Sequence, residues 1–241
     1  ILSFLRKPFF SIITVTLNCK NDLIKTINSV QSQNYENFIH IIKDGNSVDG
    51  TNQIDISNLK NTRLYISSDK GVYDAMNQAT VYAEGDYILF LNSGDFFASK
   101  NILSDLSNII LRNPKYNCYA GQTLQIKYPS NKIFRLLGAN WINKFFPLAQ
   151  IPHPSFIIEK KLLSKISLPF DADLKIASDY KQQLILRKLN LLKVCSFNKL
   201  ITIMPLGGKS TKSLNSYLRG FLEVATFSYE IYGVFFLYIL L

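Results

Sequence analysis

The first hundred residues alternate between two patterns of hydrophobic positions. Short β-branched and aromatic runs, typical of buried strands, are separated by stretches in which apolar residues recur at the three- and four-residue spacing of a helix. The expected strands are 11–17, 38–42, 63–67 and 87–91, and the expected helices are 22–33, 51–59, 73–83 and 101–112. Strict alternation of strand and helix predicts right-handed crossovers and a parallel sheet with helices on both faces.

Beyond residue 115 the pattern changes. Strand-like runs are expected at 117–127, 155–158 and 192–204, and helices at 159–165, 177–189 and 213–232. We interpret this half as a continuation of the same sheet together with further elements beside it. The predicted fold class is therefore α/β, with an open, mostly parallel, twisted sheet flanked by helices.

Polar residues follow three of the expected strands where each strand ends. Asp44 follows the second strand, Asp69 the third and Asp95 the fourth. Ligands of an open parallel sheet bind in the crevice outside the carboxyl ends of its strands. Aspartate is also a common turn residue, and for one loop that explanation would suffice. Three consecutive strand ends favour a binding site.

Composition narrows the classes of partner and compartment. The net charge of +10 favours acidic or phosphorylated partners, but there is no Lys/Arg-rich tail and no nucleic-acid-binding signature, so nucleic acid is not expected. Cys19, Cys118 and Cys195 are odd in number and far apart, which argues against a disulfide framework and fits a reducing cytoplasm. No run approaches the ~20 apolar residues of a membrane-spanning helix.

Four segments together resemble a known family. Residues 44–51 (DGNSVDGT) are similar to a DGSxDGT loop, residues 69–77 (DKGVYDAMN) to a GxxxARN segment, residues 91–95 (LNSGD) stand in the place of a DXD metal motif, and residues 176–180 (IASDY) resemble the start of a helix that bears a catalytic base. Their order and spacing resemble a family 2 glycosyltransferase with the GT-A fold, of the type that assembles bacterial surface polysaccharides.

The resemblance implies a nucleotide-sugar donor, most simply a UDP-sugar. Asp44 would accept the imide N–H of uracil, since an ionised carboxylate only accepts hydrogen bonds. The alternative for Asp44 is to cap the turn that follows it, which is also the simpler explanation of Asp49 before Thr51. The residues expected to bind the nucleotide are Thr16, Asn18, Asp44, Asp69, Lys70, Asn77, Asn92 and Ser93.

Asp95 is the expected metal ligand. A divalent metal, Mg²⁺ or Mn²⁺, would bridge the donor diphosphate through hard oxygen ligands and stabilise the departing nucleoside diphosphate. The sequence departs from the usual motif, because Asn92 stands at the first acidic position and Gly94 at the second. One carboxylate with diphosphate oxygens and water would still complete a Mg²⁺ shell.

The resemblance assigns Asp179 as the general base that takes the acceptor hydroxyl proton, with inversion at the anomeric carbon. The alternative is that Asp179 only complements the positive end of its helix. His153, between two prolines, and Lys209, in a Gly-rich loop, are possible substrate contacts, with ordinary loop positions as the alternative. His40 is interpreted as structural, and Asp171 and Asp173 as turn residues.

The expected domain plan follows. Residues 1–210 form a GT-A-like catalytic domain with a nucleotide-sugar half at about 9–115 and an acceptor half at about 116–210, and residues 211–241 form a C-terminal amphipathic helix. Tyr217, Leu218, Phe221, Leu222, Ala225, Tyr229 and Tyr232 recur at helical spacing, and Trp141, Phe145 and Phe146 lie among basic residues. Such patterns suit a membrane interface, or packing on the core.

The predicted activity is transfer of a hexosyl or N-acetylhexosaminyl group to a hydroxyl of a glycan or lipid-linked sugar, in the cytoplasm or at the inner face of the cell membrane. One alternative is a nucleotidyltransferase, which would need a Gly-rich loop after the first strand, where this chain reads Leu17-Asn18-Cys19-Lys20-Asn21. The other is a non-catalytic, membrane-associated partner of another transferase, which the asparagine at position 92 keeps open.

Overall fold

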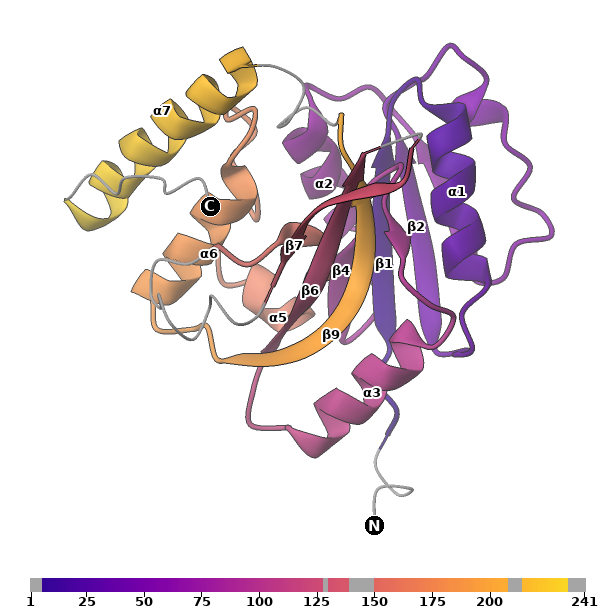
Figure 1. The fold of residues 1–241 in the computed structure, drawn as a ribbon, viewed down its shortest axis with the longest axis horizontal. Helices are drawn as coiled ribbons and strands as arrows, with labels where there is room; N and C mark the ends of the chain where they lie inside the picture. The colour runs from indigo at the N-terminus through magenta and orange to yellow at the C-terminus, as the bar shows by residue number, and fades with distance from the viewer. Residues whose placement is uncertain (1–5, 128–129, 139–149, 208–213, 234–241) are drawn as a thin grey trace.

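The structure is a computed structural model that describes residues 6–127, 130–138, 150–207 and 214–233. A nine-stranded sheet forms its centre, in the order β3-β2-β1-β4-β8-β6-β9-β5, with β7 paired to β6 (Figure 1). The strands are β1 (Phe10–Thr16), β2 (Phe38–Asp44), β3 (Thr62–Ile66), β4 (Tyr87–Phe90), β5 (Phe96–Phe97), β6 (Cys118–Lys127), β7 (Lys132–Leu137), β8 (Phe156–Glu159) and β9 (Val194–Pro205).

The helices are α1 (Lys20–Gln31), α2 (Val72–Thr80), α3 (Ile102–Arg112), α5 (Lys160–Leu163), α6 (Ser178–Lys188) and α7 (Leu214–Tyr232), with short 3₁₀ turns at Thr51–Gln53 and His153–Ser155. The α/β class and the flanking helices are confirmed. None of the helices described in these ranges has the length and apolar character needed to cross a bilayer.

The two halves of the sheet pair differently. β1 is parallel to β2 and β4, and β2 is parallel to β3, as the strand–helix alternation predicts. β8 joins β4 and β6 by antiparallel pairing, whereas β6 and β9 are parallel. The second half therefore continues the same sheet, as expected, but through mixed pairing.

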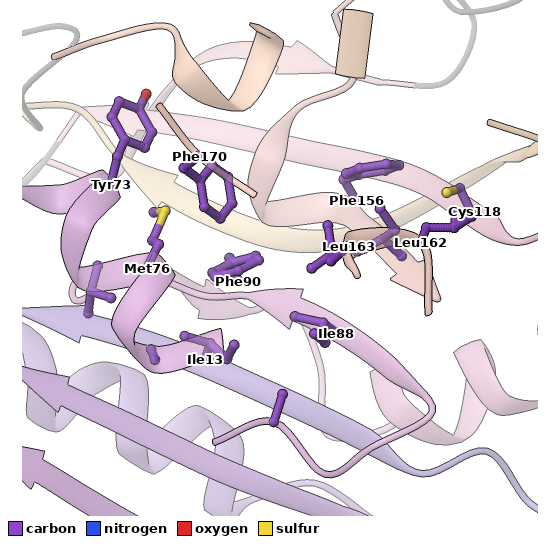
Figure 2. Close-up of a cluster of buried hydrophobic side chains, with 14 of the residues drawn as sticks. Ile13, Tyr73, Met76, Ile88, Phe90, Cys118, Phe156, Leu162, Leu163 and Phe170 are labelled. Atoms are coloured by element: carbon purple, nitrogen blue, oxygen red, sulfur yellow. The ribbon is translucent and has the colours of Figure 1, made fainter. Parts of the chain in front are cut away.

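Every residue of β1 and of β2 is buried, because helices cover both faces of the sheet. On one face Ile13, Tyr73, Met76, Phe90 and Phe170 belong to a single apolar cluster (Figure 2). On the other face a second cluster includes Phe10, Ile12, Val30, Leu89, Leu103 and Leu106, with side chains from β1, β4, α1 and α3. This double burial explains why apolar residues occupy neighbouring positions in these strands and do not alternate with polar ones.

The predicted helix at 51–59 is wrong. Only Thr51–Gln53 forms a 3₁₀ turn, and the chain then runs irregularly to β3. Asp49 accepts the backbone N–H of Thr51, and Asp55 accepts that of Ser57. Such local side-chain bonds offer the backbone an alternative to the helix.

α7 packs along α6. Val224, Phe227 and Ile231 of α7 form a buried cluster with Ala177, Tyr180 and Leu184. Leu218, Leu222 and Tyr229 point elsewhere and are each more than half exposed. The C-terminal helix therefore presents one apolar stripe to the domain and leaves other apolar side chains uncovered.

Candidate functional site

The ends of β1 and β2 are joined through Ser47. Asp44 is completely buried, and its two carboxylate oxygens accept the Ser47 backbone N–H at 2.7 Å and the Ser47 hydroxyl at 2.6 Å. The Ser47 hydroxyl oxygen in turn accepts the Asn18 backbone N–H, and the Asn18 side chain accepts that of Val48. The alternative role of Asp44, capping the following turn, is confirmed. Carboxylate oxygens keep further accepting capacity, and the uracil contact stays a prediction.

The end of β3 is fixed to β2 by a buried ion pair. The Lys43 ammonium group lies 2.9 Å from Asp69 Oδ2, and the two side chains are 0% and 6% exposed. Lys43 also donates to the carbonyls of Asp44 and Ser67, so all three of its N–H groups have partners. A Cβ at Gly45 would lie 2.7 Å from Asp69 Oδ2, which explains why glycine stands there. Asp69 and Lys70 thus lie at the same edge as Asp44, as predicted.

The end of β4 meets the end of β1 at Cys19. The Cys19 thiol lies 3.1 Å from the Thr16 hydroxyl and 3.4 Å from the Ser93 hydroxyl. The Ser93 backbone N–H bonds to the Val15 carbonyl. The residues predicted at the nucleotide site from these two strands are therefore neighbours in space.

Two oxygen-bearing side chains of the 92–95 segment have no partner in the described part of the chain. Asn92 Oδ1 is buried without a hydrogen bond. Asp95 is 7% exposed, and burial raises the pKa of its carboxyl to about 8. Buried hydrogen-bond acceptors normally have partners, so the lack of partners for these two side chains calls for an explanation. Within the described ranges no group of three or more His, Cys, Asp or Glu side chains is arranged around a metal position.

Asp179 lies in the first turn of α6 and is only 8% exposed. Its Oδ1 lies 3.3 Å from the Tyr73 hydroxyl, and its Oδ2 accepts the Gln150 amide at 3.2 Å. Burial lowers the pKa of His153, and the nearby Asp179 carboxylate opposes that shift. The His153 ring packs against Phe90, the last residue of β4, at a centroid distance of 4.9 Å. Asp179 therefore lies beside α2, and His153 lies between it and the end of β4.

Two of the residues predicted to bind the nucleotide, Asn77 and Lys70, form hydrogen bonds with other parts of the protein. The Asn77 amide donates to the Phe170 carbonyl at 2.7 Å and accepts the Phe170 N–H at 2.9 Å, which ties α2 to the loop before α6. The Lys70 backbone N–H bonds to Asp74. The structure gives Asn77 a connecting role, and its predicted contact with the nucleotide stays a prediction.

The loop before α6 is also bound from α7. The Glu223 carboxylate accepts three consecutive backbone N–H groups, those of Lys175, Ile176 and Ala177, at 2.8–2.9 Å. Ala177 is the N-cap of α6, and Lys175 and Ile176 precede it, so these bonds hold the segment just before the helix, at the positive end where a carboxylate is favoured. Glu223 fills that position for the segment that leads into Asp179.

Several remaining expectations are confirmed. His40 is buried within β2 and bonded to the Thr14 hydroxyl, and Asp171 accepts the Asp173 N–H in a turn. Lys209 and the aromatic residues Trp141, Phe145 and Phe146 lie outside the described residues. The sequence did not single out Tyr73, Gln150, Glu223 or Lys43. The sequence feature that could have pointed to Tyr73 is its four-residue spacing from Asn77, which places both residues on one face of α2.

An open α/β sheet binds its ligands at the carboxyl-terminal ends of its strands, where the polar loops of this chain lie. The chain belongs to glycosyl transferase family 2, because residues 11–167 match the family described as "Glycosyl transferase family 2". This membership favours glycosyl transfer over the nucleotidyltransferase alternative.

Relatives and solved structures agree with the family. An uncharacterized glycosyltransferase of Mycobacterium tuberculosis is 30% identical over 197 residues, covering 75% of this chain and 68% of the relative. The Escherichia coli protein WfaP, named as a UDP-Glc:alpha-D-GlcNAc-diphosphoundecaprenol beta-1,3-glucosyltransferase, is 36% identical over 99 residues, 40% of this chain and 39% of WfaP. Staphylococcus aureus TarS, in complex with UDP-GlcNAc, has a TM-score of 0.71 and 20% identity over 93% of this chain and 67% of that chain. The last likeness concerns the fold.

Proposed function

We propose that this protein is an inverting glycosyltransferase that moves a sugar from a UDP-linked donor to a hydroxyl group of a glycan or lipid-linked acceptor. The observation that carries the proposal is the Asp179 carboxylate, held between Tyr73 and Gln150 beside the donor-side loops. Family membership supports the reaction class. The UDP-GlcNAc complex of TarS and the lipid-linked acceptor in the name of WfaP support the choice of substrates.

The loops after β1, β2 and β3 would hold the nucleotide. Their polar backbone and side-chain groups face the sheet edge where nucleotides bind in this class of fold. Asp44 is the candidate for the uracil imide, and Thr16, Asn18 and Ser93 are the neighbouring polar groups. The buried Lys43–Asp69 pair keeps the β2 and β3 loops in one arrangement, so the binding surface is largely formed before the donor arrives.

The 92–95 segment fits a divalent metal. Asn92 Oδ1 and the Asp95 carboxylate are hard oxygen donors, both buried and both without a protein partner in the described ranges. These two residues would hold Mg²⁺ or Mn²⁺ together with oxygens of the donor diphosphate. When bound, the metal supplies Lewis-acid stabilisation of the negative charge on the departing UDP.

Asp179 would act on the acceptor side. Its carboxylate takes the proton from the acceptor hydroxyl while that oxygen forms a bond to the anomeric carbon and the bond to the UDP oxygen breaks. Attack from the face opposite UDP inverts the anomeric centre. His153, packed on Phe90 and close to Asp179, would line the region between donor and acceptor. If the protein were instead a non-catalytic partner of another transferase, its role would not require a carboxylate at position 179.

We expect UDP with Mn²⁺ to raise the melting temperature of the protein more than UDP alone, because a ligand that binds only the folded state stabilises it. Asp95→Asn should abolish the metal-dependent part of the shift, since the only carboxylate of the 92–95 segment is lost. Asn92→Ala should weaken it less. Thermal shift with UDP, GDP and CMP, each with Mn²⁺ or EDTA, measures these effects.

The donor assignment is wrong if GDP or CMP stabilises the protein at millimolar concentration and UDP does not. The metal assignment is wrong if Asp95→Asn retains the full Mn²⁺-dependent shift. Asp105→Asn is the matched control, because Asp105 lies on α3 in an ion pair with Lys199 and away from the sheet edge.

We also propose peripheral contact with a membrane through the exposed apolar residues of α7. Leu218, Leu222 and Tyr229 share one side of the helix and are each more than half exposed. The net charge of +10 favours an anionic surface.

Sedimentation with vesicles containing phosphatidylglycerol should pellet the protein, and Leu218→Ser/Leu222→Ser should reduce the bound fraction. Equal binding of parent and double variant would contradict the role of α7.

A further inference from the structure

Tyr73 lies between Asp179 and the loop that follows β3, residues 67–71, which we call the donor segment. It is the second residue of α2, and α2 begins directly after Gly71, whose N–H bonds to Asp69. The Tyr73 side chain is 6% exposed, and its ring stacks on Phe170 at a centroid distance of 5.9 Å. In Figure 2 the two rings lie side by side at one end of the apolar cluster, and the Tyr73 oxygen is directed away from it.

The Tyr73 hydroxyl bonds to the segment that carries the base. It donates to the Ile176 carbonyl at 2.6 Å and lies 3.3 Å from Asp179 Oδ1. Burial raises the pKa of Tyr73 well above its ordinary value, and the Asp179 carboxylate raises it further, so the hydroxyl keeps its proton. One donor therefore serves both the backbone before α6 and the carboxylate on it.

A second contact from the same helix reaches the same loop. Asn77 lies one turn after Tyr73, and its amide pairs with both backbone groups of Phe170. Tyr73 and Asn77 together hold residues 170–179 against α2. The position of the base is thus set by the helix that follows the donor segment, although the two are more than a hundred residues apart in the chain.

We propose that Tyr73 is a positioning residue that holds Asp179 and its loop in the orientation needed for proton transfer, and that it links the base to the donor segment through α2. The inference rests on the proposed role of Asp179 as the base. Tyr73 acts through its hydroxyl, because the ring would pack on Phe170 equally well as phenylalanine.

The test is Tyr73→Phe, with Tyr35→Phe as the matched control. Tyr35 is also buried, at 8% exposure, and its hydroxyl also donates to a backbone carbonyl, that of Pro8, at 2.7 Å. Tyr35 lies against α3 and not against the base loop. Each variant loses one hydroxyl that contacts a backbone carbonyl and a side-chain oxygen, so a general loss of stability should affect the two alike.

Hydrogen–deuterium exchange needs no acceptor and no activity. We expect peptides that cover residues 170–180 to exchange about five- to tenfold faster in Tyr73→Phe than in the parent, because the loop loses an anchor. In Tyr35→Phe these peptides should exchange as in the parent. An unchanged rate for residues 170–180 in Tyr73→Phe overturns the inference.

Turnover separates positioning from a structural effect. With UDP-GlcNAc as donor and water as acceptor, Tyr73→Phe should lower kcat by between about tenfold and 10²-fold, the range expected for a misplaced catalytic group. KM for the donor should stay within about twofold, since Tyr73 acts on the base side. A fall in kcat of the same size in Tyr35→Phe would assign the effect to stability and overturn the inference.

The double variant Tyr73→Phe/Asp179→Asn distinguishes a failure of the positioning role of Tyr73 from a failure of the proposed role of Asp179 as the base. If Tyr73 acts through Asp179, the double variant should be no slower than Asp179→Asn alone, because interacting positions are not additive. Independent, multiplied effects would overturn the inference and leave the base in place. A parent-like rate for Asp179→Asn would instead overturn the proposed function.

Discussion

Asp179→Asn is expected to slow sugar transfer by about 10²–10⁴-fold, the usual contribution of a positioned general base. Asparagine keeps the size and the accepting oxygen of the side chain but cannot take the acceptor proton. The asparagine oxygen can accept the Gln150 amide, and its NH₂ group can donate to the Tyr73 hydroxyl oxygen, so the side chain should keep its place. Single-turnover transfer, measured beside a melting curve, checks the expectation.

The affinity for UDP should change little, because Asp179 is assigned to the acceptor side. The loss should therefore appear in kcat more than in donor KM. Asp173→Asn is the matched control, since Asp173 is exposed in the turn before the same helix. If Asp179 only complements the helix end, both variants will turn over like the parent, because asparagine caps helices well.

Lys43→Met is expected to lower the free energy of unfolding by about 3–5 kcal/mol, the typical cost of leaving one member of a buried ion pair without its partner. The Lys43 side chain is fully buried, and Asp69 is 6% exposed, so water cannot replace the lost ammonium group. Methionine fills a similar volume, so the effect comes from the lost charge together with its hydrogen bonds to Asp69, Asp44 and Ser67. Urea unfolding followed by circular dichroism measures it.

Two further variants sharpen this result. Lys60→Met removes an ion pair with Glu36 in which both side chains are largely exposed, and it should change stability little. Lys43→Met/Asp69→Leu removes both buried charges and should recover part of the stability, because the Asp44 and Ser67 carbonyls and the Gly71 N–H still lose their partners; UDP binding should still weaken. A stability of Lys43→Met equal to that of Lys60→Met would show that the buried pair does not hold the β2 and β3 loops.

The parts of the fold that could be predicted are those in which local pattern and tertiary burial agree. β1 and β2 are buried on both faces, so apolar residues occupy neighbouring positions in them, as at Ile12–Ile13 and Ile41–Ile42. α1 and α2 each bury one stripe, which produces the helical spacing. β7 was missed because most of its residues are exposed, and β5 because two residues carry no periodicity. At 51–59, local aspartate bonds replaced the expected helix.

The strand-end carboxylates could be predicted for a similar reason: parallel strands in series bring their ends to one edge. The surroundings of Asp179 could not. Tyr73 and Gln150 are distant in sequence, and nothing in the spacing of a tyrosine on α2 reveals that its hydroxyl meets α6. Asn77 illustrates the same limit, because its motif resembles a nucleotide contact and its amide pairs with Phe170.

The three hydrogen bonds that Glu223 accepts make α7 a structural support of the segment before Asp179. A boundary at residue 210 separates a catalytic sheet from a C-terminal helix in the sequence, yet the carboxylate that caps the approach to Asp179 lies beyond it. Cutting the chain at residue 210 would remove the acceptor of the Lys175, Ile176 and Ala177 N–H groups just before Asp179. Any evolutionary shuffling or engineered exchange of the C-terminal helix must therefore carry an acceptor for these groups, so the choice of this helix is tied to the arrangement of the segment around Asp179.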